Sequence, residues 1–586
     1  MFQSMSNNTE SNWKCEGYTE EPHPSIEVEW DQKCPICNRE RNSPKHKGGK
    51  FPIGAVIAAL SAVAVLGGGY WLWPNLVSQN STDSSQESTE QTITPTPSPN
   101  DQTGEKLGST VSSASPSEKA DSSQESTEQT ITPKPSPNDQ TGEKVDSTVP
   151  STPPSEKATT QKQLEGFSQG EQTLFSGTGN VNRDRGIEAF QKGDYSKAAE
   201  LFKKATEADR NDPEVLIYYN NALANQKPNP ITLAVVVPID SRLTSAQEML
   251  RGVAQAQNKF NNSGGFNDQL LQIAIANDGN KPELSEKVAR ELVNDSSIIG
   301  VIGHNSSSAS QAGLAVYEEA GLPMISPTST STSLSGKAFF RTVPSDAAAG
   351  EKLANYAYNK LLIDNAVIFY NPKSSYSSSL KEAFEKNFDS LGGQVIRSVD
   401  LSDPEFDAKI DITRIALKKE AQAALLFPNT QFTSVALEIT KANSQLETEE
   451  RLKLLGGDAL YSPTTLKAGA SVEDLILAVP WFAKSPLSQD FSKMAEKQWG
   501  GLVNWRTAMS FDATQAFINA FSSNISRSEV LQQLQGINLS SDKTSGSPLE
   551  FTSEGERRSE PILVKATQGG SVAPNNSKFG FDIVRE

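Results

Sequence analysis

The chain has 586 residues, which is too long for a single hydrophobic core, so several folded units are expected. Its formal net charge of -17 repels phosphate backbones and argues against a nucleic-acid partner. The three cysteines all lie before residue 40, so the long remainder of the chain cannot form a disulfide.

Residues 1–50 read as a cytoplasmic head. Cys34 and Cys37 have the C-x-x-C spacing of a zinc knuckle, which supplies two thiolates to the metal. A zinc ribbon needs a second pair, but only Cys15 is present and Tyr18 stands where its partner is expected. A degenerate ribbon in which Cys15, Cys34 and Cys37 hold a structural zinc is one interpretation, and a flexible reduced tail is the other. No other cofactor is expected.

Residues 51–74 are predicted to form a transmembrane helix. Positions 51–73 contain no charged residue, and this length of helix spans a hydrocarbon layer of about 30 Å. Lys and Arg cluster before the span, whereas the next cation after it is Lys106, so the N-terminus is placed in the cytoplasm. The long polar prefix argues against the alternative, a cleaved signal peptide. We expect a single-pass protein of a bacterial inner membrane with a periplasmic ligand-binding domain. The alternative is that this domain lies on the outer surface of a Gram-positive cell.

Residues 75–166 are predicted to be a disordered linker. They contain no aromatic residue and are rich in Ser, Thr and Pro, so they bury too little apolar surface to offset the entropy of ordering. Residues 83–120 and 121–158 form a tandem 38-residue repeat that is identical at 32 positions. The repeat lacks the apolar positions that stacking requires, so it is interpreted as a duplicated spacer.

Residues 167–227 are predicted to form a short helical hairpin. Gly193, Tyr195 and Phe202 resemble positions of a tetratricopeptide repeat, with small residues at the helix crossing and aromatics between the helices. A second repeat is only half present, and stacking of whole repeats is what builds a peptide groove. The hairpin is therefore either a small docking module or a collar that packs on the next domain.

In residues 228–586, strands alternate with helices. This alternation predicts parallel sheets with right-handed crossovers, and the length exceeds one α/β core, so two lobes are expected. Lobe 1 is assigned to about 230–345 and 479–550, and lobe 2 to about 346–478 plus the C-terminus. The main predicted strands are 231–237, 271–276, 298–302, 324–326, 339–342, 366–370, 423–427, 452–455 and 475–479.

The run IGHNSSSASQAGLAVYEEAGLPMISPTST at 302–330 combines a serine cluster, a helix, a glycine, an apolar strand and Ser-Pro-x-x-Thr. Phe340, Arg341 and Thr342 follow it. This order and spacing resembles the leucine/isoleucine/valine-binding protein family over roughly residues 230–586. Its members are type I periplasmic binding proteins, so the resemblance implies an α/β two-lobed clamp that serves an ABC importer.

A free amino acid presents a carboxylate and an ammonium on one carbon. Ser307 stands between a predicted strand and the next helix, whose N-terminus suits a carboxylate. The resemblance implies that Ser307 binds the carboxylate, that Tyr376 covers the ligand, and that Asp458 faces the ammonium where relatives usually have Glu. Each also has a purely structural interpretation as a cap, packing or turn residue. The expected ligand-binding residues are Ser307, Ser308, Thr328, Ser329, Thr330, Tyr376 and Asp458.

The expected pocket wall is polar where the family often has apolar or aromatic residues. An aliphatic ligand side chain leaves such groups unpaired, at about 1–3 kcal/mol each. We therefore hypothesise a polar or small amino acid, or an amide, over leucine. The wall residues are Ser245, Asn305, Ser306, Thr430 and Gln431.

The sequence offers little support for an enzyme. His304 is the only histidine of the large domain, and no carboxylate is placed by the sequence to orient it as a base, so it is expected as a strand-end residue at the pocket edge. The favoured role is the substrate-binding component of an ABC-type importer, with a permease as partner. The alternatives are a ligand-sensing receptor subunit and a non-enzymatic scaffold or activator of cell-wall synthesis.

Overall fold

The computed structural model describes residues 13–17, 22–28, 166–175, 179–418, 420–574 and 577–585. The chain divides into two compact units, Met1–Ser147 and Thr148–Glu586. In the first unit, β1 (Trp13–Gly17) pairs antiparallel with β2 (Pro22–Val28), and Cys15 lies opposite Ile26.

The predicted membrane span at 51–74, nearly all of the linker, and both Cys34 and Cys37 lie outside the described residues. Within the described ranges, no helix has the length and apolar character needed to cross a membrane. The same ranges contain no group of three His, Cys, Asp or Glu side chains arranged to hold a metal. The span, the spacer and the zinc site therefore stay predictions.

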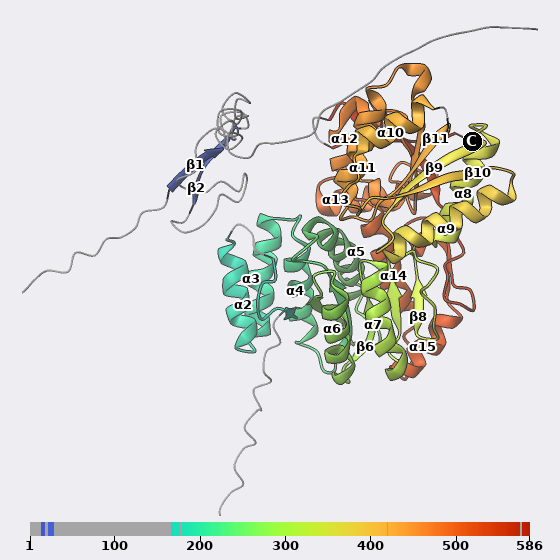
Figure 1. Ribbon diagram of the computed structural model, residues 1–586. Coiled ribbons are helices and arrows are strands. Elements are labelled where there is room, and N and C mark those ends of the chain that lie inside the picture. The colour runs from blue at the N-terminus through green and yellow to red at the C-terminus, as the bar shows by residue number, and fades with distance from the viewer. Residues whose placement is uncertain are drawn as a thin grey trace, which may run out of the picture. The chain divides into compact units, whose positions relative to one another are not determined.

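The first sheet of the second unit forms lobe 1 (Figure 1). In strand order it contains β3 (Phe167–Ser168), β5 (Leu271–Asn277), β4 (Ile231–Val237), β6 (Ile298–Ile302), β7 (Met324–Ser326) and β8 (Phe339–Arg341). All residues of β4 are buried, which is typical of a strand in a parallel sheet covered on both faces. Because β4, β5 and β6 run parallel, the loops after them meet at one edge of the sheet.

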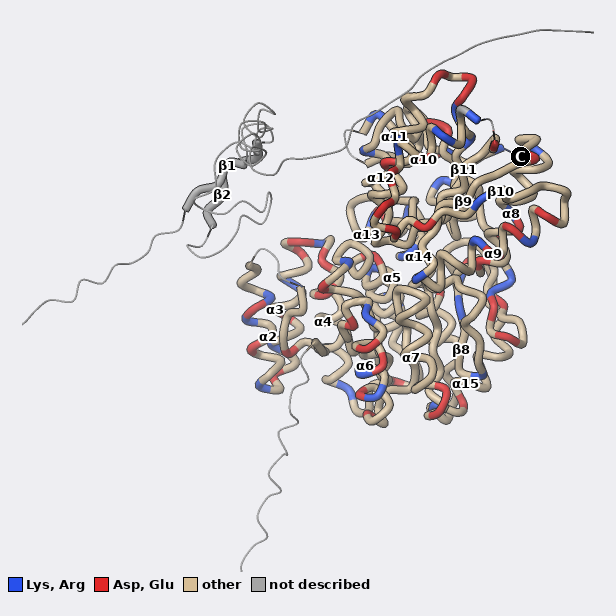
Figure 2. Tube along the Cα trace, viewed as in Figure 1, with Lys and Arg blue, Asp and Glu red and all other residues tan. Residues whose placement is uncertain are grey.

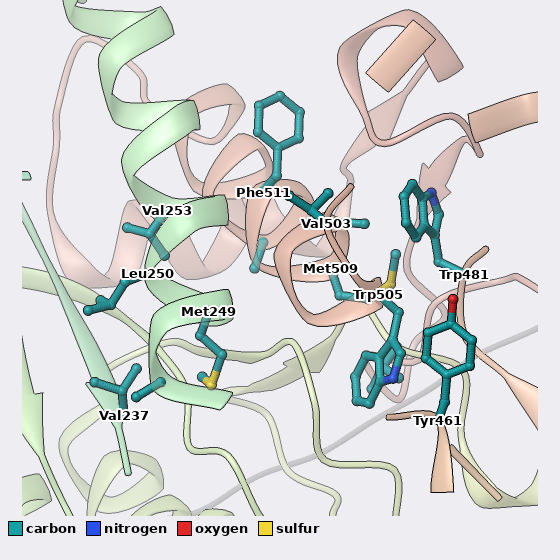
Figure 3. Packing of buried hydrophobic residues seen from close by; sticks show 14 of the residues in the cluster. Val237, Met249, Leu250, Val253, Tyr461, Trp481, Val503, Trp505, Met509 and Phe511 are labelled. Atoms are coloured by element: carbon teal, nitrogen blue, oxygen red, sulfur yellow. The ribbon is translucent and has the colours of Figure 1, made fainter. Parts of the chain in front are cut away.

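The helices of lobe 1 itself pack on its sheet. Helix α5 lies along α14, and Figure 3 shows Met249 and Val253 of α5 beside the segment that carries Met509 and Phe511. Gly252 permits this contact, since an added Cβ would lie 2.2 Å from the Thr507 carbonyl oxygen. The helices are α5 (Leu243–Asn262), α6 (Pro282–Asn294), α7 (Ser307–Ala320), α14 (Trp505–Asn519) and α15 (Arg527–Gln535).

The second sheet forms lobe 2. Its strand order is β10 (Gln394–Asp400), β9 (Asn365–Tyr370), β11 (Ala423–Phe427), β12 (Lys453–Gly456), β13 (Ile476–Val479), β16 (Ile562–Gln568) and β17 (Phe579–Ile583). Helix α8 (Asp346–Asn359) precedes these strands along the chain, and the helices between them are α9 (Ser375–Ser390), α10 (Ala408–Leu417), α11 (Thr433–Ser444) and α12 (Pro463–Lys467). Helix α13 (Gln489–Trp499) follows β13, and β14 (Asn538–Leu539) pairs with β15 (Leu549–Glu550).

The expected parallel pairing is confirmed for most strands of the two sheets and is wrong at three strands. β3 pairs antiparallel with β5, and β16 pairs antiparallel with both β13 and β17. β16 and β17 are consecutive along the chain with no helix between them, and neighbouring strands joined in this way run antiparallel. One edge of each sheet is therefore antiparallel, whereas the opposite edge strands, β8 and β10, pair in parallel with their neighbours.

In the described part of the chain, three helices precede lobe 1: α2 (Val181–Gln191), α3 (Tyr195–Ala208) and α4 (Pro213–Ala224). Phe202 of α3 packs between Phe190 and Tyr218. Helix α4 lies against α5 and β5, where the Asn221 amide donates to the Ile273 carbonyl at 2.8 Å and its oxygen accepts from the Ile273 N–H at 2.9 Å. These helices therefore pack on lobe 1, while their assignment to the tetratricopeptide repeat stays a prediction.

Candidate functional site

A cavity of about 470 Å³ lies between the two lobes. Its lobe 1 wall comes from the loops after β4, β5 and β6, and its lobe 2 wall from the loops after β9, β11 and β12, so both sheets present their carboxyl ends to it. Nine of the residues expected from the sequence line it, namely Asn305, Ser306, Ser307, Ser308, Thr328, Tyr376, Thr430, Gln431 and Asp458.

The N-terminus of α7 forms the centre of the lobe 1 wall. Ser306 is the N-cap residue, and its hydroxyl accepts the N–H of Ala309 at 3.3 Å. The first N–H groups of a helix have no partner within the helix, so those of Ser307 and Ser308 are available to a ligand. The Ser307 hydroxyl accepts the N–H of Ser331 at 3.3 Å, which fixes the serine against the next loop. This arrangement suits an anionic group.

Three expected residues do not line the cavity. Ser329 is buried behind the wall, where its hydroxyl bonds to that of Ser310 at 2.7 Å. Thr330 is also buried, and its carbonyl accepts the N–H of Asp346 at 2.8 Å. Ser245 lies in the first turn of α5, while the preceding Arg242 reaches the cavity instead. Spacing along the chain located these loops correctly, but it did not show which side chains face inward.

His304 differs from the expectation in two ways. It is fully buried and absent from the cavity lining, so it does not lie at the pocket edge. Asp278 stands 2.8 Å from its Nδ1, and the Tyr317 hydroxyl lies 3.1 Å from its Nε2, so a carboxylate does orient the ring. The His304 carbonyl accepts the Thr328 hydroxyl at 3.1 Å. This buried group therefore supports the wall from behind and has no access to a ligand.

Asp458 and Tyr376 belong to the lobe 2 wall. Asp458 begins a single 3-10 turn, Asp458–Leu460, directly after β12, and the Tyr376 hydroxyl accepts the N–H of Ala459 at 3.5 Å. Burial raises the pKa of Asp458, while the positive charge of Arg506 acts in the opposite direction. The acid is therefore electrostatically coupled to a cation in the cavity.

Arg506 is a lining residue that the sequence did not reveal. Its guanidinium stacks on the Trp505 ring, 4.1 Å from the ring centroid. Its Nε has no hydrogen-bond partner among the described residues. Arg506 comes from α14, far along the chain from the other lining residues, and no motif marks it.

Three further cations line the cavity, namely Arg242, Lys281 and Lys373. Each follows the carboxyl end of a strand, β4, β5 or β9, so the position after a predicted strand was the signal that could have found them. Figure 2 shows Lys and Arg positions on both sides of the boundary between the lobes.

The two lobes contact each other around the cavity. Arg242 Nε donates to the Thr430 hydroxyl at 3.3 Å, and the hydroxyls of Ser308 and Ser375 lie 3.2 Å apart. The side-chain oxygens of Asn305 and Asn429 are buried in the lining without hydrogen-bond partners among the described residues. The cavity thus combines hydrogen bonds between the lobes with unpaired polar groups in its lining, which is an arrangement suited to a polar ligand.

The sequence of this chain is similar to those of known proteins. The profile of a family described as periplasmic binding protein matches residues 230–569. An amino acid binding protein of Pseudomonas aeruginosa is 28% identical over 172 residues, covering 29% of this chain and 46% of that protein. A Leu/Ile/Val-binding protein of Escherichia coli is 29% identical over 209 residues, covering 35% of this chain and 55% of its own length. The chain thus spans about half the length of these relatives.

The solved structures show the same fold. A leucine-binding protein from Thermotoga maritima has 18% sequence identity and a TM-score of 0.53, covering 61% of this chain and 98% of that one. A substrate-binding protein of an ABC transporter from Desulfitobacterium hafniense, in complex with Leu, has 21% identity and a TM-score of 0.51, covering 61% of this chain and all of that one.

Proposed function

Because this chain belongs to the periplasmic binding protein family, we propose that it is a membrane-anchored extracytoplasmic protein that binds an amino acid or a related amide. The observation that carries this proposal is one cavity with a helix N-terminus on one wall and Asp458 on the other. Its volume of about 470 Å³ is typical of a small-molecule site. The predicted span at 51–74 provides the anchor, and an ABC-type permease is the proposed partner.

In the proposed complex, the two charged groups of an amino acid contact opposite lobes. The ligand carboxylate accepts hydrogen bonds from the N–H groups of Ser307 and Ser308 at the start of α7. The ligand ammonium faces Asp458, and Tyr376 covers the ligand from lobe 2. A molecule that contacts both walls favours the closed form over an open one, so binding and closure are coupled. No chemical step is required of these residues.

The polar wall favours a polar ligand side chain. Asn305 and Thr430 lie on opposite lobes, and Gln431 extends the polar surface. A leucine side chain placed there removes these groups from water without giving them partners, at a cost of about 1–3 kcal/mol each. We therefore propose that polar or small amino acids and amides bind more tightly than leucine.

Thermal unfolding of the full chain against a panel of free amino acids and amides tests this function. A ligand at about 100 times its Kd adds about 2.7 kcal/mol of stability, which raises the Tm by a few degrees. We expect Asp458→Asn to abolish the shift, because the neutral amide removes the negative charge that faces the ammonium. Asp389→Asn, at an exposed position of α9, is the matched control and should retain the full shift.

Two results would contradict the proposal. A panel without any stabilising amino acid or amide would reject ligand binding and favour the scaffold or activator role. A shift of equal size in the wild type and in Asp458→Asn would show that Asp458 does not face the ligand ammonium.

A further inference from the structure

We propose that the cavity selects an amino acid whose side chain carries a second anionic group, such as a carboxylate. This inference rests on the proposed function and specifies its ligand class. It starts from the charges of the lining, which contains four cations, Arg242, Lys281, Lys373 and Arg506, and a single carboxylate, Asp458. An amino acid with a neutral side chain has no net charge and leaves this imbalance in place.

Three of the cations have no acidic partner. Among the residues that the structure describes, no carboxylate forms a salt bridge with Arg242, Lys281 or Lys373. Arg242 donates from Nε to the Thr430 hydroxyl and from Nη1 to the Ser241 carbonyl, both of which are neutral acceptors. Asp240, near Gly279, is exposed and lies outside the lining. Among the described residues, these three cations therefore have no carboxylate at salt-bridge distance, and Lys281 and Lys373 are exposed at the cavity.

The backbone adds to this positive potential. Arg242 is the N-cap residue of α5 and Lys281 is the N-cap residue of α6, and neither side chain accepts a capping hydrogen bond. Their helices begin beside α7, so the positive ends of three helix dipoles meet at the cavity. Asp458 and Arg506 lie in the same lining with opposite charges, so three cations remain without a counter-charge among the lining residues.

The cations lie on both lobes. Arg242 and Lys281 belong to lobe 1, while Lys373 belongs to the loop between β9 and α9 in lobe 2. Closing the lobes brings these like charges together, which opposes closure in the absence of a counter-charge. A ligand with a second anion removes this repulsion and gives the lysines a charged partner. The α-carboxylate binds at α7, and the side-chain anion faces the three unpaired cations.

The test compares three ligands of nearly the same shape by calorimetric titration of the full chain. L-Glutamate has the ammonium and both carboxylates, L-glutamine lacks the second charge, and glutarate lacks the ammonium. L-Aspartate and L-asparagine repeat the comparison with a shorter side chain. We expect each acidic amino acid to bind at least about tenfold more tightly than its amide, with the preference decreasing as salt increases.

Variants that remove one positive charge identify the residues that produce the preference for glutamate over glutamine. Lys281→Gln and Lys373→Gln should each weaken glutamate binding severalfold more than they weaken glutamine binding. Lys287→Gln, on the exposed side of α6 outside the lining, makes the same charge change and should preserve the glutamate preference.

The outcomes separate this inference from the function on which it rests. If glutamine or asparagine binds as tightly as the acidic amino acids, the proposed preference for a second anionic group is wrong, while the proposed binding of an amino acid stands. Glutarate binding as tightly as glutamate would support the anionic site and overturn the pairing of Asp458 with an ammonium. Absence of binding by every amino acid and by glutarate would overturn both proposals.

Discussion

Glu214 is a buried carboxyl group that attaches the segment before α2 to helix α4. Its Oε1 accepts the Leu174 N–H at 2.6 Å and the Tyr218 hydroxyl at 2.9 Å, and its Oε2 accepts the Thr173 hydroxyl at 2.7 Å. Burial raises the pKa of Glu214 from 4.5 to about 7. These three donors lower the pKa only in part, so the cost of removing the charge from water dominates.

This shift predicts how stability depends on pH. Between pH 4.5 and about 7 the folded protein retains a proton that the unfolded chain releases, so stability falls as pH rises through this window and is constant above it. The loss is on the order of 3 kcal/mol. Glu214→Gln removes the titration, so its Tm should exceed that of the wild type at pH 8 and match it near pH 4.5. Glu207→Gln, exposed on α3, is the control, and equal pH profiles for wild type and Glu214→Gln would contradict the assignment.

Individual site residues were predictable only where the chain presents them in a local pattern. Ser307 and Ser308 stand at a strand-to-helix junction, so their position at the cavity followed from the sequence. Ser329 and Thr330 stand in the correct loop, but the direction of their side chains depends on packing against α7 and α8. Arg506 had no local signal, because the sheet topology brings it to the cavity from a distant part of the chain.

At the scale of elements, the contact between α5 and α14 joins an early helix of lobe 1 to a helix that lies much later in the sequence. Gly252 lies at the closest approach, and the Thr507 hydroxyl donates to the Glu248 carbonyl at 2.9 Å one turn away. Trp499 of α13 adds a hydrogen bond from Nε1 to the Gln255 side chain at 2.9 Å. Helices far apart in the sequence thus complete one core.

Gly252→Ala should destabilise the protein by about 1–3 kcal/mol, because its Cβ would overlap main-chain atoms of α14 that cannot rotate away. The free energy of urea unfolding measures the effect. Gly501→Ala, where an added Cβ meets no atom within 4 Å, is the matched control and should be close to neutral. A loss no larger than that of the control would show that α5 and α14 separate at little cost.

Elements with strong apolar patterns were predictable, including the edge strand β8, whereas the edge strands β3 and β10 were not. The strands at 231–237 and 298–302 have the predicted bounds because every residue in them is buried. β10 has a largely exposed pattern with Arg397 and Ser398 pointing to solvent, so it lacks the run that marks a strand. β3 has only two residues, and its pairing partner lies in a different part of the chain.

At the scale of the whole molecule, the two lobes are held together at the rim of the cavity by neutral hydrogen bonds. The Thr332 N–H donates to the Ser379 hydroxyl at 2.9 Å, and the Ser308 and Ser375 hydroxyls meet beside the cavity. Contacts of this kind contribute about 0.5–1.5 kcal/mol each. A ligand that contacts both walls therefore has a large effect on the balance between open and closed forms.

Ligand binding should slow hydrogen exchange at both walls of the cavity and leave the first helices unchanged. We expect increased protection at the start of α7 and at the turn Asp458–Leu460, because both become covered when the lobes close. Exchange in α2 and α3, which lie away from the cavity lining, serves as the internal control. Protection confined to one lobe would show binding without closure.

The packing of α4 and β3 on lobe 1 also bears on how this chain can evolve. Domains are exchanged between genes at boundaries where few contacts are lost. A cut at residue 230 would remove β3 from the edge of β5 and the Asn221 amide from Ile273, leaving a strand edge open to pairing with other chains. We therefore expect a fragment that begins near residue 166 to be more stable than one that begins at residue 230.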